Sequence, residues 1–132
     1  MSNIKVFEND LPNDLDLSNE KFIGLDNEAL GLVLGRDPLT LVQLGLESKN
    51  FYLVKLNRET YKAPNLVRVL SNNKTQFIMH YARQDLLWLK YHLNVKPKNI
   101  FCTKVASKIA RTASSFHGYK DLVKELCGKD IS

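Results

Sequence analysis

Two carboxylates, Asp26 and Glu28, end an apolar run that begins at Phe22. An apolar run with polar groups only at its end is typical of a buried strand. Side chains alternate along a strand, so the two carboxylates are predicted to share a face, roughly 7 Å apart. Such a pair repels and is costly to desolvate, and a divalent cation would offset this because Mg²⁺ binds carboxylate oxygens. The alternative is a strand that runs into a solvated turn, where two acids cost little.

A third carboxylate, Asp85, is predicted near the start of a helix that follows a short strand. It is the only acid between Thr60 and Lys120. The helix dipole stabilises a carboxylate at this position, so a purely structural role would account for it. The same placement would let Asp85 approach the two carboxylates of the earlier strand, and both roles stay open.

Charge is divided unevenly along the 132 residues, although the formal net charge is only +5. Residues 1–60 carry 6 Lys and Arg against 10 Asp and Glu, whereas residues 61–132 carry 13 against 4. A basic half beside an acidic half suggests a polyanionic partner, with nucleic acid first among the candidates. A solvated helical surface rich in Lys is the alternative.

The composition, 44% hydrophobic and 25% charged, is that of an ordinary globular domain. No apolar run approaches the ~20 residues of a membrane span, and the N-terminus lacks the basic and apolar regions of a signal peptide. Cys102 and Cys127 match no metal-ligand spacing. We therefore expect reduced thiols and a cytoplasmic protein.

Hydrophobic periodicity and turn residues predict the elements that must position the acids. Strands are predicted at residues 4–7, 22–26, 39–46, 51–56, 76–79 and 100–102. Helices are predicted at residues 63–70, 82–93, 104–112 and 119–126, with Thr103 as the cap of the third. Strands two to four form an antiparallel meander, and the later alternation of helix and strand indicates parallel strands. The predicted fold class is therefore α/β, a mixed sheet with helices packed on it.

Four short segments, in this order, resemble motifs of the ribonuclease D-like 3′–5′ exonucleases. DNE at 26–28, followed by the strand LVQLGL, resembles the first exonuclease motif, and FIMHYARQD at 77–85 resembles the second. CTKVASKIAR at 102–111 and HGYKDLVKEL at 117–126 resemble the segments that follow in small bacterial members. The resemblance covers nearly the whole chain and implies the ribonuclease H-like fold of the DEDD exonuclease superfamily.

This resemblance implies two divalent ions, Mg²⁺ or Mn²⁺, around a scissile phosphate. Asp26 would contact both ions, Glu28 would hold the water-activating ion, and Asp85 would anchor the other. Leu30 would pack against the terminal base. The implied activity is hydrolysis of RNA or single-stranded DNA from the 3′ end.

In this family the third motif is a Tyr or His followed four residues later by Asp, on a helix after the last segment that the resemblance covers, and the sequence ends at Ser132, before that helix. We therefore expect a single exonuclease-like domain, residues 1–132, that is incomplete at its C-terminus and whose two-metal site is incomplete. Apolar surface near residues 22–30 would then favour self-association. The alternative to an active exonuclease is a catalytically impaired domain that binds nucleic acid or a protein partner.

The candidates for contact with nucleic acid are Leu30, His80, Arg83, Gln84, Lys104, Lys108 and Arg111. The three cations of the predicted third helix recur at i, i+4 and i+7, so they are expected on one face. That face could contact phosphates or be merely solvated. Arg83 and Gln84 are better placed to meet a backbone phosphate because they flank Asp85. His80 is expected to be hydrogen-bonded at the strand end, with substrate contact as the alternative.

Overall fold

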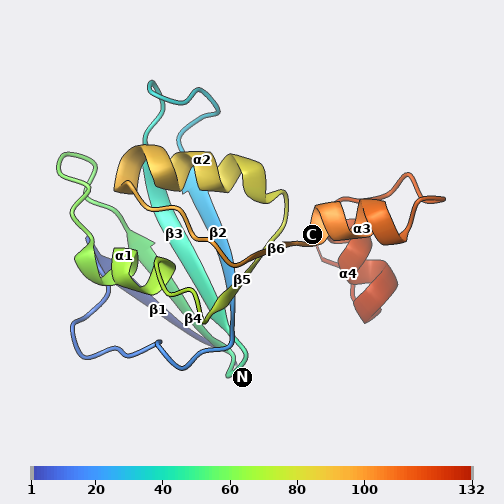
Figure 1. Cartoon of the computed structure of the whole chain (residues 1–132), viewed down its shortest axis with the longest axis horizontal. Helices are drawn as coiled ribbons and strands as arrows, with labels where there is room; N and C mark the ends of the chain where they lie inside the picture. The colour runs from blue at the N-terminus through green and yellow to red at the C-terminus, as the bar shows by residue number, and fades with distance from the viewer. Residues whose placement is uncertain (1, 132) are drawn as a thin grey trace.

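A six-stranded sheet organises the chain, with neighbouring strands in the order β1-β4-β3-β2-β5-β6 (Figure 1). The computed structural model describes residues 2–131. The strands are β1 (Asn3–Glu8), β2 (Phe22–Ala29), β3 (Leu39–Leu46), β4 (Asn50–Lys55), β5 (Gln76–Met79) and β6 (Ile100–Cys102). The helices are α1 (Pro64–Leu70), α2 (Ala82–Leu93), α3 (Thr103–Ala110) and α4 (Tyr119–Cys127). The predicted α/β class and its ribonuclease H-like mixed sheet are confirmed.

Strands β2, β3 and β4 form the predicted antiparallel meander. Helical crossovers bring β5 parallel to β2 and β6 parallel to β5, as the alternation of helix and strand indicates. Strand β1 pairs in parallel with β4 and forms the other edge of the sheet. The bounds of β5, α2 and β6 are those predicted, whereas β2 continues to Ala29 because its pairing with β3 does not stop at Asp26.

One face of the sheet is buried under α1 and α2. Alternate residues of the central strands point into this core, among them Ile23, Val42 and Phe77, which have no exposed surface. Helix α2 adds Trp88 and Leu89 to the same cluster. Burial of a large apolar side chain contributes about 1.5–3 kcal/mol. This packing therefore holds β2 firmly beneath α2.

The opposite face of the sheet, which we call the open face, remains largely accessible to solvent. Residues paired across neighbouring strands share a face. The register places these residues on the open face: Ile4, Val6, Gly24, Asp26, Glu28, Gln43, Gly45, Phe51, Leu53, Ile78 and Phe101. Ile4, Val6, Phe51 and Phe101 are apolar and exposed, so this face is a hydrophobic surface with two carboxylates at one end.

The last two helices form an arm, residues 103–131, that extends from the end of β6 (Figure 1). Thr103 is the first residue of α3 and does not cap it, contrary to the prediction. Its hydroxyl instead donates a 3.1 Å hydrogen bond to the carbonyl of Met79 and so ties the arm to β5. None of the helices described between residues 2 and 131 is long and apolar enough to cross a membrane.

Candidate active site

Strand β2 presents Asp26 and Glu28 on the open face. Asp26 lies opposite Gln43 of β3, and Glu28 lies opposite Leu41. The predicted shared face is therefore confirmed. Both side chains are exposed, however, so the expected cost of desolvating this pair is wrong. Exposed carboxylates keep most of their hydration, and the buried acid of the site is the third one.

Asp85 occupies the first turn of α2 and is only 9% exposed. The side-chain amide of Asn27 donates a 3.2 Å hydrogen bond to the Asp85 carbonyl, so the helix start is attached to β2. Burial raises the pKa of the Asp85 carboxyl from 3.8 to about 7, and repulsion from Asp26 and then Glu28 adds to the rise. The fold thus brings together acids that lie almost 60 residues apart in the chain.

These three acids have the donor chemistry of a site for a hard divalent cation. Carboxylate oxygens are the ligands that Mg²⁺ and Mn²⁺ prefer, and a cation would relieve the repulsion that Asp85 experiences. Within residues 2–131, no three His, Cys, Asp or Glu side chains are gathered around one point closely enough to form a metal centre. The three acids thus suit a divalent cation in charge and ligand type, with Asp26 and Glu28 as the accessible donors, but their side chains are not gathered around one point in the described residues.

A groove of about 510 Å³ runs along the open face beside Asp26. Gly24 and Gly45 face each other across β2 and β3 and lower its floor. Its lining includes Asp26, Gln43, Phe51, Ile78, His80, Thr103 and Tyr119. A Cβ at Gly45 would lie 3.2 Å from the Phe51 ring, which is tight contact. The two glycines therefore give the groove its depth next to the carboxylates.

His80 links the groove to the arm. Its Nδ1 lies 2.9 Å from the Thr103 hydroxyl, and its ring lies 5.6 Å from that of Tyr119. Burial lowers the pKa of His80, and the nearby Lys104 lowers it further. The expected hydrogen bond at the strand end is confirmed. Because the Thr103 hydroxyl donates to the Met79 carbonyl, the Nδ1–H of His80 donates to Thr103, and the Nε2 of the neutral ring can accept a bond. Contact between His80 and substrate stays a prediction.

The other candidates for nucleic-acid contact lie around the carboxylates or on the arm. Leu30 is exposed directly after β2, and its N–H donates to the Pro38 carbonyl at 3.0 Å. Arg83 is exposed and Gln84 half-buried in the first turn of α2. Leu30 follows Glu28 by two residues, and Arg83 and Gln84 directly precede Asp85; contact of these three residues with nucleic acid stays a prediction.

The three cations expected on one face of the third helix are not equivalent. Lys104 lies over the Tyr81 ring, with its Nζ 4.1 Å from the ring centroid, and Lys108 is exposed. Helix α3 ends at Ala110, and the Arg111 guanidinium forms an ion pair with Glu125 and donates to the Ser107 hydroxyl. Arg111 therefore lies just after the end of α3 with its charge paired inside the arm, and contact between the three cations and phosphate stays a prediction.

Sequence reasoning missed three residues that shape the site. Asn27 holds Asp85 in place, whereas Thr103 and Tyr119 line the groove. Asn27 stands between the two acids of β2, so alternation places its side chain on the α2 side of the sheet. That position could have indicated its role. No sequence signal links Tyr119 to His80, because their contact depends on how the arm folds back.

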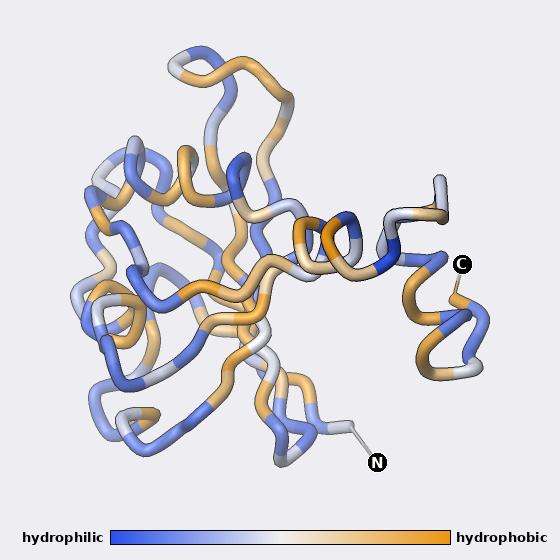
Figure 2. Tube along the Cα trace, turned by 45° about the vertical axis from the view of Figure 1, so that its right-hand side comes forward, coloured by the Kyte–Doolittle hydropathy of each residue, from blue (hydrophilic) through white to orange (hydrophobic). Residues whose placement is uncertain are grey.

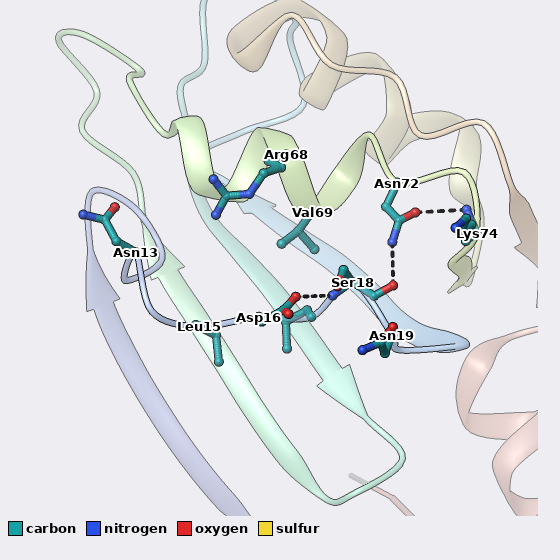
Figure 3. Close-up of a pocket in the computed structure, with 10 residues that line it drawn as sticks. Asn13, Leu15, Asp16, Ser18, Asn19, Arg68, Val69, Asn72 and Lys74 are labelled. Carbon is teal, nitrogen blue, oxygen red and sulfur yellow. Dashed lines mark hydrogen bonds between the residues drawn. The ribbon is translucent and has the colours of Figure 1, made fainter.

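A second hollow, of about 620 Å³, lies between α1 and the segment that joins β1 to β2 (Figure 3). Its polar groups are partly occupied with one another: Asp16 accepts a bond from the Ser18 N–H, and Asn72 donates to the Ser18 carbonyl. None of the three acids lines it. This hollow is therefore not part of the candidate active site.

A family model described as 3′–5′ exonuclease matches residues 6–132. Brucella melitensis NrnC bound to pGG is 36% identical, with a TM-score of 0.93 over 100% of this chain. The same protein with bound Mg²⁺ is 37% identical, with a TM-score of 0.92 over 98% of this chain. The chain spans about 64% of the length of these NrnC chains. No curated protein matches the sequence.

More distant structures share the fold. Escherichia coli RNase D, an exoribonuclease involved in structured RNA processing, is 18% identical, with a TM-score of 0.70. It matches 87% of this chain and 30% of its own. Trypanosoma brucei RNase D in complex with RNA U12 is 19% identical, with a TM-score of 0.72 over 87% of this chain and 42% of its own. At this identity the likeness shows the fold alone.

Proposed function

We propose that this chain, which belongs to the family of 3′–5′ exonucleases, removes nucleotides from the 3′ end of RNA or other single-stranded nucleic acid with the help of divalent cations. The observation that carries the proposal is the placement of the three acids around the end of β2: Asp26 and Glu28 lie on its open face, and Asn27 between them bonds to the start of α2, where Asp85 is buried. The bound Mg²⁺ and pGG of the NrnC relatives support it. The chain spans 64% of the length of those NrnC chains, so the activity of a whole NrnC protein comes to this chain only as a proposal.

Asp26, Glu28 and Asp85 would hold the cations. When bound, two Mg²⁺ or Mn²⁺ ions would supply the positive charge that activates an attacking water and stabilises the leaving 3′ oxygen. The Asp85 carboxyl must first release its proton, because its pKa is about 7. Asn27 holds Asp85 at a fixed position relative to Asp26, so it acts as a positioning residue.

The residues around the acids would orient the nucleic acid. Leu30 offers an exposed apolar side chain for the terminal base, as the family resemblance implies. Arg83 and Gln84 can reach backbone phosphates beside Asp85, and charge-assisted hydrogen bonds to phosphate are strong. Lys104 and Lys108 on the arm would contact phosphates further from the 3′ end. Such contacts are independent of sequence, so we expect little base preference from them.

A nuclease assay on a 5′-labelled single-stranded RNA tests the proposal. With Mg²⁺ or Mn²⁺, the wild-type chain is expected to shorten the RNA progressively from its 3′ end, and chelation should stop the reaction. Asp26→Ala should lower the rate by about 10²–10⁴-fold, the range for loss of a catalytic group. Glu47→Ala is the matched control, because Glu47 is an exposed carboxylate in the β3–β4 turn. Equal rates for wild type and Asp26→Ala would refute the proposal.

A second candidate function is binding of nucleic acid without turnover. It is favoured by the exposed cation Lys108 and by the Lys104–Tyr81 stack, which need no metal to contact a phosphate chain. In this case the wild-type chain would retain a labelled oligonucleotide in a binding assay at low salt, and the oligonucleotide would remain intact with either cation. The same labelled RNA therefore discriminates between the two functions.

A further inference from the structure

The loop that joins β2 to β3, residues 30–38, exposes apolar side chains directly after the strand that carries two of the acids. Leu30 is 64% exposed and Leu32 is 82% exposed, and Val33 and Leu34 are exposed as well. Figure 2 shows this apolar stretch in the loop that stands out at the top of the molecule. A cluster of exposed apolar side chains commonly marks an interaction site.

Asp37 holds this loop in one shape from within. It is only 9% exposed, although it lies in a surface loop. One carboxylate oxygen accepts a 2.9 Å hydrogen bond from the N–H of Val33, and both oxygens accept bonds from the Arg36 guanidinium. These bonds, that from Arg36 first, lower the pKa of Asp37 to about 2. The carboxylate is therefore charged at neutral pH, and charge-assisted bonds of this kind are strong.

Two glycines let the loop close around this carboxylate and against α2. A Cβ at Gly31 would lie 2.1 Å from an oxygen of the Asp37 carboxylate, so a side chain there would displace the carboxylate. Gly35 has a φ of +88° and lies against Tyr91, whose hydroxyl oxygen would be 3.3 Å from a Cβ at this position. The loop is thus tied to itself and to α2, the helix that carries Asp85.

We propose that Asp37 is a positioning residue, and that the loop it holds packs its apolar side chains on a base next to the 3′-terminal one. The inference rests on the proposed function, which supplies the nucleic acid. Leu32 follows Glu28 by four residues, so the chain keeps them within about 14 Å of each other. A single strand whose 3′ end lies at the acids therefore has its last bases near the loop. Leu30 is expected at the terminal base, which leaves residues 32–34 for the base before it.

A base is the part of a nucleic acid that suits this loop. The side chains of residues 32–34 are aliphatic and offer no hydrogen bond to a phosphate. The cation of the loop, Arg36, is already paired with Asp37. An unpaired base has a face that a protein can contact whatever the sequence. A duplex keeps its bases stacked and paired, so the loop should favour single-stranded ends.

Fluorescence anisotropy in chelator tests this inference with two matched, 5′-labelled single-stranded RNAs. One carries all its bases, and the other is abasic at the three positions before its 3′-terminal nucleotide. The wild-type chain should bind the complete RNA about tenfold more tightly, the factor that partial burial of one aliphatic side chain can supply. Leu32→Ser should bring this ratio close to one. Val6→Ala is the matched control, because Val6 is exposed on β1, which two strands separate from β2.

The role of Asp37 is tested with the same two RNAs. Asp37→Ala removes the carboxylate and Gly31→Ala displaces it, so each variant should lower the ratio of the two affinities. A merely structural role would weaken both RNAs equally and leave the ratio unchanged, which would overturn the positioning role. Circular dichroism checks the fold of these variants, and Leu32→Ser keeps every hydrogen bond of Asp37.

The inference and the proposed function can fail separately, because chelator prevents turnover in the binding assay. Equal affinity of the wild-type chain for both RNAs would overturn the inference, even if the chain shortens RNA with Mg²⁺. A Leu32→Ser chain with the wild-type ratio would also overturn it. A chain that prefers the complete RNA through Leu32 and Asp37 but never shortens it would support the inference and refute the proposed nuclease activity.

Discussion

The side-chain amide of Asn27 donates a hydrogen bond to the backbone carbonyl of Asp85, with 3.2 Å between nitrogen and oxygen. This bond joins the strand that carries two acids to the helix that carries the third. Asn27 lies between Asp26 and Glu28, so a single short segment supplies both the exposed donors and the attachment of the buried one. The spacing of the three carboxylates therefore depends on a neutral side chain that would not ligate a cation.

Loss of this hydrogen bond should affect activity more than stability. Asn27→Ala is expected to lower the nuclease rate by about 10–100-fold, as removal of a group that orients a ligand typically does. The free energy of unfolding should fall by only about 1 kcal/mol. Paired rate and urea-unfolding measurements check this. Asn73→Ala, at an exposed position after α1, should change neither, and an unchanged rate for Asn27→Ala would contradict the positioning role.

The raised pKa of Asp85 makes stability depend on pH when no metal is present. Its pKa is about 7 in the folded protein against 3.8 in the unfolded chain, so the folded state holds the proton more tightly. This contribution is fully present below pH 3.8 and is lost as the pH rises through 7. Asp85→Asn cannot titrate, so it should raise the melting temperature relative to wild type at pH 8.

Thermal unfolding in chelator at pH 5 and pH 8 measures this effect. The gain from Asp85→Asn should be several degrees at pH 8 and smaller but still measurable at pH 5, because the contribution of Asp85 is lost progressively between pH 3.8 and pH 7 and a change of 1 kcal/mol shifts the melting temperature by about 2–8 °C. Asp16→Asn is the control. The pKa of the exposed Asp16 is lowered, mainly by its hydrogen bonds with Ser18, so Asp16 is ionised at both pH values and this variant should have the same effect at each. An equal effect of Asp85→Asn at both pH values would show that the carboxyl is not protonated at neutral pH.

Divalent cations should stabilise the fold more as the pH rises, which is opposite to the pH dependence of stability without metal. A cation needs the deprotonated carboxylate, so its binding to wild type should release a proton and weaken as the pH falls below about 7. We expect millimolar Mg²⁺ or Mn²⁺ to raise the melting temperature of the wild-type chain at pH 8. The rise should be smaller for Asp26→Ala, whereas Glu47→Ala should behave like wild type. Calorimetry in two buffers of different ionisation enthalpy would count the released protons.

The fold was largely predictable because its elements carry clear local signals. Strand β5 and helix α2 have the predicted bounds, since the apolar period changes abruptly between Met79 and Ala82. The end of β2 was not predictable, because polar residues such as Glu28 look like a turn unless the pairing with Leu41 is known. Thr103 looks like a helix cap in sequence, but the carbonyl of Met79 offers its hydroxyl a better partner.

The site was predictable only as far as local geometry reaches. Strand alternation correctly places Asp26 and Glu28 on one face. Which acid is buried depends on tertiary packing, and there the expectation was wrong: Asp85 is buried and the strand pair is exposed. Helical spacing groups Arg111 with Lys104 and Lys108, but it gives no sign of the ion pair with Glu125, which lies 14 residues further along the chain.

The core under α2 offers a test of the packing that holds the site. Leu89 has no exposed surface, whereas Leu87 on the outer side of the same helix is 47% exposed. Leu89→Ala should lower the free energy of unfolding by about 2–5 kcal/mol through lost burial and a residual cavity. Leu87→Ala should stay within about 0.5 kcal/mol of wild type. Urea titrations of both variants make the comparison, and similar losses would mean that α2 does not pack on the sheet as described.

Salt dependence should separate the cations that contact nucleic acid from those that are only solvated. Each phosphate neutralised on a single strand releases counterions and contributes about −0.7 to the slope of log K against log salt. If Lys104 and Lys108 each contact a phosphate, the double variant to Ala should reduce the magnitude of the slope by about 1.4. Lys62→Ala, at an exposed position before α1, should leave the slope unchanged.

Arg111→Ala should instead destabilise the arm, because its charge pairs with Glu125. Fluorescence anisotropy of a labelled oligonucleotide from 50 to 300 mM salt would measure these slopes. Identical slopes for wild type and the Lys104, Lys108 double variant would exclude α3 as a phosphate-binding helix.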